Sequence, residues 1–596
     1  MLNDFSINYK SLFVLSTSMI LSTFFIVIFL SLTGTVLVII SSQLFQTSPR
    51  NDRPNTSSDE SSQDPPKGKV AVIGLGISGL ASLKNLLEQG FDVVGLERND
   101  YIGGIWEWTD NTKQTSVLKT TVANSSKQFG CFTDFPFADD IPDYPSASDV
   151  SANLRAYADY FSLHPHIKTG VNVLRIERSG DGQAWDIHLI DKGEEKTEIQ
   201  KYDKVMICTG PWERSWKPTY KDEAMFQGRM IVGKEYKGPQ EFKDLKVVVV
   251  GMANTACDIA VDLVGNAKEV YISHRSGTRV VPRMMNGKPT INSITRQLTG
   301  LMSFFDKYLP SLGEWGSNHF AETKMLKSFP NIKPEWKLLP APSFKNTLGV
   351  INDRIIGVME TDHVQSLGGI ESFTSDGIIT DQGRHTPADV VIFCTGSYFD
   401  FSILSDEANP TTNRATHEWD NAEHSNGLRY PRLYQTLFHP DFAESLAFLG
   451  PCRGFSFAVH TNADLASQAI AQVWKNNHLL PSALEMNKWC DGNYQSALKV
   501  IKKWRTFRTG HSNAGDFEYW LNDVAGTGVN EHLGYTSLKG WSFWWKDRKL
   551  YNLIMNGVNT PFVYRLFDGR QGGRKKWNGA RNEICKANGV IFESRN

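Results

Sequence analysis

Four consecutive apolar residues, Val70–Ile73, end abruptly at Gly74, and an amphipathic segment follows in which leucines recur three or four residues apart. A second apolar run, Val93–Leu96, then stops at the acidic residue Glu97. A short continuous apolar run indicates a buried strand, and the leucine spacing indicates a helix. The pattern over residues 69–97 therefore predicts a strand, a tight turn, a helix and a second strand parallel to the first.

The turn carries the spacing G-x-G-x-x-G at Gly74, Gly76 and Gly79. In such a turn the first glycine permits the bend, the second lets the backbone approach a pyrophosphate, and the third lets helix and strand pack closely. The helix N-terminus offers unpaired N–H groups and a positive dipole end to the phosphates. At the tip of the second strand, the Glu97 carboxylate can accept hydrogen bonds from both ribose hydroxyls. This combination predicts a Rossmann-type dinucleotide site.

The stretch VVVVGMANTACD, residues 247–258, repeats this pattern with two changes. Gly251 corresponds to Gly74, but Ala253 and Ala256 replace the second and third glycines. Each alanine adds one methyl group, which could push a pyrophosphate outward and weaken its binding. A Rossmann unit that holds no ligand is therefore the alternative to a second nucleotide site.

The residues that follow favour a second site. His274 lies 23 positions after Gly251, as Glu97 lies 23 positions after Gly74, and Arg275 comes next. An acid at this position favours a free 2′-hydroxyl, whereas arginine can bind a 2′-phosphate in bidentate fashion. We therefore predict an NADP site, with Asn254 and Thr255 in its turn.

The N-terminus differs in composition from the two predicted nucleotide units, since no charged residue occurs from Ser11 to Pro49. The stretch is longer than the roughly 20 apolar residues that cross a bilayer and longer than the core of a signal peptide, about 7–15 residues. We predict a retained transmembrane anchor in residues 1–46 and a polar, disordered tether in residues 47–68. More basic residues follow the anchor than precede it, which predicts a cytosolic catalytic domain, and we take the membrane to be the endoplasmic reticulum.

Charge and cysteine usage exclude other classes. The chain has 63 basic and 64 acidic residues and a formal net charge of −1, so no overall field attracts nucleic acid. The 7 cysteines are scattered and include no C-x-x-C pair, which argues against a disulfide framework or a zinc site and for a reducing compartment. The histidines have no metal-ligand spacing, so we predict no metal.

Further stretches carry a family resemblance: ERNDYIGGIWEW (97–108), ANSSKQFGCFTDFPF (123–137), KVMICTG (204–210) and DVVIFCTGSYFDF (389–401). From about Lys69 to Cys585 the chain resembles the flavin-containing monooxygenases, which are class B flavoprotein monooxygenases. The resemblance implies that Gly104 and Trp106 lie at the flavin, that Asn124 is the family's active-site asparagine, and that Thr395 and Gly396 form a turn near the cofactors.

The resemblance also implies the fold and the chemistry. The fold would be α/β, with a Rossmann-like NADP domain inserted into a Rossmann-like FAD domain. NADPH would reduce FAD, O₂ would add at the flavin C4a atom, and the resulting (hydro)peroxide would pass one oxygen atom to a small organic substrate. Asn124 would orient the peroxide and the substrate by hydrogen bonds.

One motif departs from the family pattern F-x-G-x-x-x-H-x-x-x-(Y/F/W). The stretch FQGRMIVGKEY keeps Tyr236, which we expect on the cofactor side, but has Val232 in place of the histidine. With tyrosine at the last position, the motif resembles that of enzymes that oxygenate nitrogen or sulfur or that hydroxylate their substrate. Baeyer–Villiger oxidation of a ketone is the first alternative. A membrane-tethered flavin reductase is the second, although a disulfide reductase would need a redox-active cysteine pair that the sequence lacks.

These interpretations give a domain plan. The anchor and tether are followed by the first part of the FAD domain, the NADP domain, the second part of the FAD domain and a C-terminal extension. The predicted ranges are 69–220, 221–345, 346–480 and 481–596.

Overall fold

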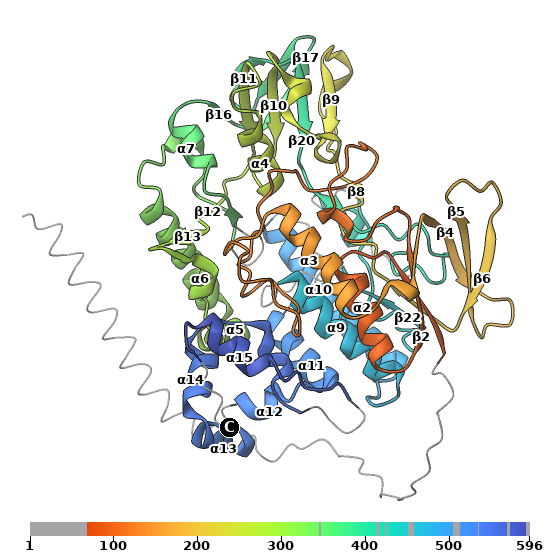
Figure 1. Ribbon diagram of the computed structural model, residues 1–596. Helices are drawn as coiled ribbons and strands as arrows, with labels where there is room; N and C mark the ends of the chain where they lie inside the picture. The colour runs from red at the N-terminus through yellow and green to blue at the C-terminus, as the bar shows by residue number, and fades with distance from the viewer. Residues whose placement is uncertain are drawn as a thin grey trace, which may run out of the picture. The chain divides into compact units, whose positions relative to one another are not determined.

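The apolar run that begins at Val70 forms the central strand of a parallel sheet. A computed structural model describes residues 68–591, except 345–346, 348, 413–416, 424, 426, 451–457, 505–512, 535 and 569–572. The sheet has the order β22-β7-β1-β2-β3, and all neighbouring strands are parallel; β2 and β22 of this sheet are labelled in Figure 1. Its strands are β1 (Lys69–Ile73), β2 (Asp92–Glu97), β3 (Ile167–Thr169), β7 (Lys204–Ile207) and β22 (Leu446–Phe448).

The valine run of residues 247–250 is the centre of a second parallel sheet with the order β16-β11-β10-β20-β9. Its strands are β9 (Arg229–Val232), β10 (Lys246–Val250), β11 (Glu269–Ser273), β16 (Val364–Leu367) and β20 (Val390–Phe393). The valines of β10 are buried, and Val247 and Val249 pack with α4 (Asn254–Leu263) and α7 (Ile355–Glu360) in one apolar core. The predicted repeat of strand, turn, helix and strand is confirmed.

The two sheets are alike beyond this repeat. Each chain segment between the second strand and the strand that ends in Cys-Thr-Gly contains a three-stranded antiparallel sheet. The first comprises β4 (Val171–Arg178), β5 (Trp185–Asp191) and β6 (Glu198–Tyr202); the second comprises β17 (Ile370–Thr374), β18 (Gly377–Thr380) and β19 (His385–Pro387). The duplication therefore extends over most of each Rossmann unit.

This arrangement corrects the predicted boundary at 345/346. Residues 364–367 and 390–393 form β16 and β20 of the second sheet, so the second unit extends to Phe393. The chain returns to the first sheet only at β22. The second Cys-Thr-Gly strand belongs to the second unit, because it hydrogen bonds to β10 and not to the first sheet.

Helices of the first unit and of the C-terminal region share one core. Helix α2 (Ile77–Glu88) packs against α9 (Val459–Trp474), and α9 packs against α11 (Ala514–Ala525). The remaining helices of this region are α3 (Ala147–Tyr160), α10 (Ala483–Trp504), α12 (Val529–Leu533), α13 (Leu538–Lys546), α14 (Arg548–Asn556) and α15 (Ala580–Ala587). The C-terminal extension is thus part of the support of the first nucleotide unit.

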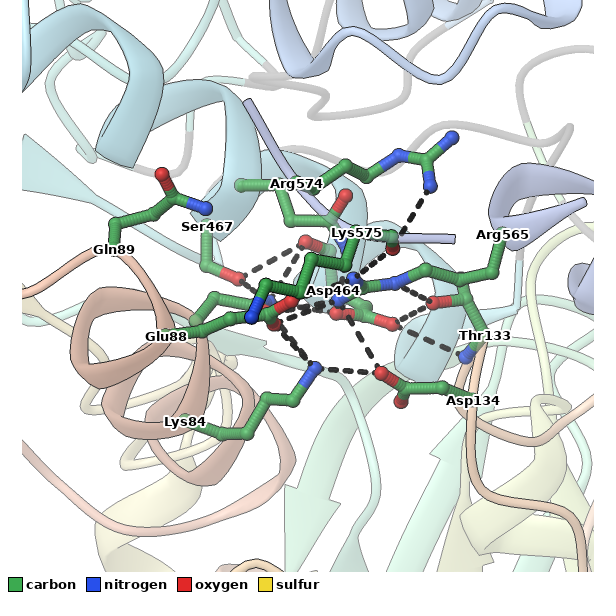
Figure 2. A network of polar contacts seen from close by, with 12 residues as sticks. Lys84, Glu88, Gln89, Thr133, Asp134, Asp464, Ser467, Arg565, Arg574 and Lys575 are labelled. Carbon is green, nitrogen blue, oxygen red and sulfur yellow. Dashed lines mark hydrogen bonds and ion pairs between the residues drawn. The ribbon is translucent and has the colours of Figure 1, made fainter. Parts of the chain in front are cut away.

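A buried ionic network joins this extension to α2 (Figure 2). Arg565, which is 2 % exposed, donates to both carboxylate oxygens of Glu88, at 3.0 and 3.2 Å, and lies 3.3 Å from Asp134. Lys84 pairs with Glu88 at 2.7 Å and with Asp134 at 2.6 Å. Although burial raises the pKa of Glu88, Arg565 and Lys84 lower it to about 2. The Glu88 carboxylate is therefore charged and paired.

Two helices inserted in the second unit also contact the C-terminal extension. Helix α5 (Arg296–Tyr308) packs against α11 and α14, and α6 (Pro310–Ser328) packs against α5 and β12 (Val280–Val281). Arg296 pairs with Glu518 of α11 at 3.2 Å. The short strands β13 (Met284–Met285), β14 (Lys288–Pro289) and β15 (Val350–Ile351) flank this insertion.

The predicted anchor and tether lie outside the described residues. Within the described part of the chain, no helix has both the length and the apolar character needed to cross a membrane. The described residues from Gly68 onward belong to one compact unit, which contains all the apolar clusters described above.

Candidate functional site

The first glycine turn has the geometry that its sequence predicts. Gly74 has φ +89°, and a Cβ there would lie 2.9 Å from the carbonyl oxygen of Cys208 on the neighbouring strand. A Cβ at Gly79 would lie 1.8 Å from the carbonyl oxygen of Gly74. The first glycine is therefore required by the turn and the third by the contact between helix and strand.

Gly76 is the N-cap of α2, and no side chain of the described residues caps this helix end. Its Cα faces Gly104: a Cβ built on Gly104 would lie only 3.0 Å from the Cα of Gly76. Gly104 and Trp106 form a short 3₁₀ turn, which Gly103 ties to the glycine turn through a 2.9 Å hydrogen bond to the Leu75 carbonyl. Two glycine backbones at an uncapped helix N-terminus fit the passage of a pyrophosphate.

Glu97 is held at the tip of β2 and is 5 % exposed. One carboxylate oxygen accepts from the Leu75 N–H at 2.8 Å, and the other accepts from the Asn99 N–H at 2.9 Å. Burial raises the pKa of Glu97, and these backbone hydrogen bonds oppose the shift. The carboxylate is thus oriented beside the glycine turn, where its remaining lone pairs can accept from ribose hydroxyls. These features fit FAD.

The second turn repeats this geometry despite its alanines. Gly251 has φ +123°, and a Cβ there would lie 2.6 Å from the carbonyl oxygen of Cys394, the counterpart of Cys208. Ala253 is the N-cap of α4 with extended backbone (φ −101°), and no described side chain caps the helix. Ala256 is fully buried. The alanines leave the uncapped helix N-terminus in place, which fits a second pyrophosphate.

The residues after this turn have separate environments. Asn254 accepts through Oδ1 from the Ile351 N–H at 2.9 Å and so connects the turn to β15, while Thr255 is exposed. His274 is buried between Ser276 and Ser366, and burial lowers its pKa. Arg275 is exposed and forms no ion pair with any described residue. Of the two residues predicted at the 2′-position, the arginine is thus the one available to a phosphate.

Tyr236 lies in the core of the second unit. It is 2 % exposed, stacks on Phe242, and donates its hydroxyl to Asp262 of α4 at 2.7 Å. Val232, at the family's histidine position, has its backbone N–H bonded to Glu235 at 2.8 Å. Any effect of Tyr236 on a cofactor would therefore pass through the position of α4.

The second Thr-Gly turn is tied to the linker between the units. Thr395 donates its hydroxyl to the Trp216 carbonyl at 2.5 Å, and the Trp216 N–H donates to the Gly396 carbonyl at 2.9 Å. This turn continues into β21 (Ser397–Tyr398), which pairs with β8 (Arg214–Ser215). Thr395 and Gly396 thus hold the crossing strands together at the end of β20.

Asn124 is exposed and lies on a loop that an arginine of the second unit holds. Arg283 donates to the Val122 carbonyl at 2.9 Å, to the Ala123 carbonyl at 3.2 Å and to Asn124 Oδ1 at 3.3 Å. Asp353 balances its charge at 3.1 Å. Arg283 was not predicted from the sequence, because no local pattern shows that its side chain reaches a loop about 160 residues earlier.

Two parallel sheets, each with a glycine turn, an uncapped helix N-terminus and a Cys-Thr-Gly strand, define a protein with two dinucleotide sites. A profile of the flavin-binding monooxygenase-like family matches residues 67–594, and the chain belongs to this family. It is a flavin-dependent monooxygenase, and its cofactors are FAD and NADPH, as the two turns predict.

Curated relatives match over nearly the same length. The chain is 36 % identical to monooxygenase aurF of Gibberella zeae over 524 residues, which cover 88 % of this chain and 98 % of that protein. It is 30 % identical to flavin-containing monooxygenase 5 of Cavia porcellus over 535 residues, 87 % of this chain and 91 % of that protein.

Solved structures share the fold. The S-allyl-L-cysteine S-oxygenase from Allium sativum has a TM-score of 0.55 and 19 % identity, with 81 % of this chain and 93 % of that chain covered. A structure of OTEMO in complex with FAD and NADP has a TM-score of 0.55 and 18 % identity, with 78 % of this chain and 98 % of that chain covered. The predicted fold with two dinucleotide-binding domains is confirmed.

Proposed function

We propose that this monooxygenase binds FAD at Gly74, Gly76 and Glu97, binds NADPH at Gly251 and Arg275, and oxygenates nitrogen or sulfur in a small organic substrate or hydroxylates it. When bound, the reduced flavin supplies the activation of O₂, while the chain supplies position and electrostatics. The net reaction consumes O₂, NADPH and one proton, and it yields the oxygenated product, NADP⁺ and water.

The orientation of the Asn124 amide carries this proposal. Because Arg283 donates to Oδ1, the amide nitrogen of Asn124 remains as the donor of the loop. Arg283 itself is paired with Asp353 and bonded to two backbone carbonyls, so the loop presents a neutral donor and not an uncompensated cation. An uncompensated cation would stabilise the attack of an anion on a ketone. Transfer of an oxygen atom to an amine or thioether needs only a neutral hydrogen-bond donor.

Substrate panels test this choice of reaction. Purified enzyme with NADPH and ¹⁸O₂ is given a tertiary amine, a thioether and a cyclic ketone, and the products are identified by mass spectrometry. We expect ¹⁸O in an N-oxide or sulfoxide. A lactone as the main product would refute the proposal and favour Baeyer–Villiger oxidation. Flavin reduction without any labelled product would favour the reductase.

The choice of coenzyme rests on Arg275. Arg275 follows His274, which occupies the position of Glu97 in the first unit, and it has no competing carboxylate partner among the described residues. A bidentate, charge-assisted contact with a 2′-phosphate would therefore distinguish NADPH from NADH.

We also propose that residues 1–46 anchor the enzyme in the endoplasmic reticulum membrane, with the catalytic part in the cytosol. The support is the uncharged stretch from Ser11 to Pro49 and the basic residues that follow it. Such a segment is long enough to span a bilayer, and positive residues near a span favour its cytosolic side.

A further inference from the structure

The short helix α13 has large apolar side chains on its outer face. Leu538 is 87 % exposed, Trp541 is 60 % exposed and Trp545 is 81 % exposed. Their spacing, i, i+3 and i+7, places the three side chains on one face of the helix. Most tryptophans of a folded chain cover part of a core, so two such exposed rings on one helix face indicate a binding surface.

The opposite face of α13 holds the helix on the protein. Gly540 is buried, and the Phe543 ring lies edge-to-face against Phe567 at 5.3 Å. Helix α13 also packs against α12 and α14 (Figure 1). Because this inner face is fixed by packing, the outward position of the three apolar side chains is a property of the fold.

Basic residues surround the apolar face. Lys539 and Lys546 lie on α13 and are exposed, and Arg548 and Lys549 follow at the start of α14. Arg548 lies over the Trp544 ring at 5.0 Å. The acid closest in sequence, Asp547, is paired with Arg581 and caps α14 through the Leu550 N–H. The surface around the tryptophans is therefore positive.

We propose that α13 binds the surface of an anionic lipid bilayer, with Leu538, Trp541 and Trp545 inserted at the level of the headgroups. Tryptophan and flanking lysines are the composition of helices that lie in a membrane interface. Each basic residue near an anionic leaflet adds to the attraction. This contact is separate from the proposed anchor and from the proposed reaction.

The small size of the face argues for lipid over protein. A stable protein interface buries about 800 Å² on each partner, and a helix of 9 residues with three outward side chains provides far less. A fluid bilayer makes no such demand, because a few side chains can insert singly. The same surface therefore fits a membrane better than a second folded chain.

Flotation with lipid vesicles tests the proposal. The protein used is residues 65–596, which form one compact unit and lack the predicted anchor. We expect it to float with phosphatidylcholine vesicles that contain phosphatidylserine and to float weakly with phosphatidylcholine alone. W541A/W545A should lower the partition coefficient on the order of 100-fold. K539E/K546E should lower it on the order of 5-fold for each charge, and only with the anionic vesicles.

A matched control removes equally exposed apolar side chains elsewhere. Tyr160 is 65 % exposed and Leu484 is 81 % exposed, and neither lies on α13. Y160A/L484A should float like the parent protein, and all variants should retain their bound flavin. The proposal is overturned if the parent protein does not float or if W541A/W545A floats equally well. It is also overturned if gel filtration shows a dimer that W541A/W545A converts to a monomer while vesicles bind neither, since the partner would then be a second copy.

Discussion

Two glycines of the first turn should respond differently to the same substitution. A Cβ at Gly79 would lie 1.8 Å from the Gly74 carbonyl oxygen and 2.8 Å from its carbon. Real Cβ atoms essentially never approach a heavy atom closer than 3.0 Å. Neither a methyl group nor a backbone carbonyl can rotate away, so G79A must move α2 by more than an ångström. A Cβ at Gly76 would meet Gly104 at 3.5 Å, which is ordinary contact.

The expected cost of G79A is about 3 kcal/mol, the upper end of the range for overpacking, because α2 is buried along most of its length. This corresponds to a fall of the unfolding temperature of on the order of 3 °C, because the unfolding entropy grows with chain length. We expect G76A to stay within about 1 kcal/mol of the parent, since an N-cap glycine has no side-chain cap to lose. Its methyl group should instead hinder the pyrophosphate and lower flavin content.

Thermal unfolding and the ratio of flavin to protein absorbance measure the two effects on full-length protein. G79A should lose both stability and flavin, whereas G76A should lose flavin with little change in the unfolding temperature of the flavin-free protein. An unfolding temperature for G79A equal to that of the parent would refute the steric argument. Equal destabilisation by both substitutions would show that the loss of stability depends on the G-x-G-x-x-G spacing and not on the space around each glycine.

Three further substitutions test charges. R275A should lower kcat/KM for NADPH about 10- to 150-fold and leave kcat/KM for NADH nearly unchanged. Stopped-flow reduction of the flavin measures both, with R384A, at an exposed arginine of the same unit, as the control. An equal loss with both coenzymes would contradict a phosphate contact. R283M should leave the rate of flavin reduction unchanged but raise the fraction of the consumed O₂ that is released as hydrogen peroxide, because Asn124 loses its orientation. Unchanged coupling of NADPH oxidation to product formation would exclude this positioning role of Arg283. R565M should lower stability by about 3–5 kcal/mol, since it removes one of the two buried cations that pair with Glu88 and Asp134. The control R175M removes an ion pair that is 59 % exposed on the arginine side and should cost less than about 1 kcal/mol. Similar unfolding temperatures for the two variants would contradict the importance of the network.

The sequence predicted the parts of the fold that depend on neighbouring residues. Both glycine turns, their helices and the strand that ends at Glu97 follow from spacing alone, and the structure contains each of them. The 345/346 boundary was wrong because strand pairing is not local. The carbonyl oxygens of Cys208 and Cys394 occupy equivalent places opposite Gly74 and Gly251, so the repeated Cys-Thr-Gly motif was a signal that the second unit continues to Phe393.

The residues that the sequence did not predict act across long separations. Arg283 reaches Asn124 from another unit, and Arg565 reaches Glu88 from the other end of the chain. Tyr236 stays a predicted cofactor-side residue, but its hydroxyl is bonded to Asp262. Periodicity and motif spacing describe only residues near one another in the chain, so neither could show which distant charges the fold brings together.

The alanines of the second turn do not by themselves mark a disabled site, because the two turns differ in how their helices are held. Helix α2 lies between its sheet and α9, and Asn85 is bonded to Asp464 of α9 at 2.6 Å. It cannot retreat from Gly74 to make room for a methyl group. In the second unit Ala256 is at the equivalent position of α4 and is fully buried, so this helix lies far enough from Gly251 to accept a methyl group. The third glycine of the first unit is thus demanded by the packing around its helix, and both units retain the uncapped helix N-terminus that a phosphate can bind.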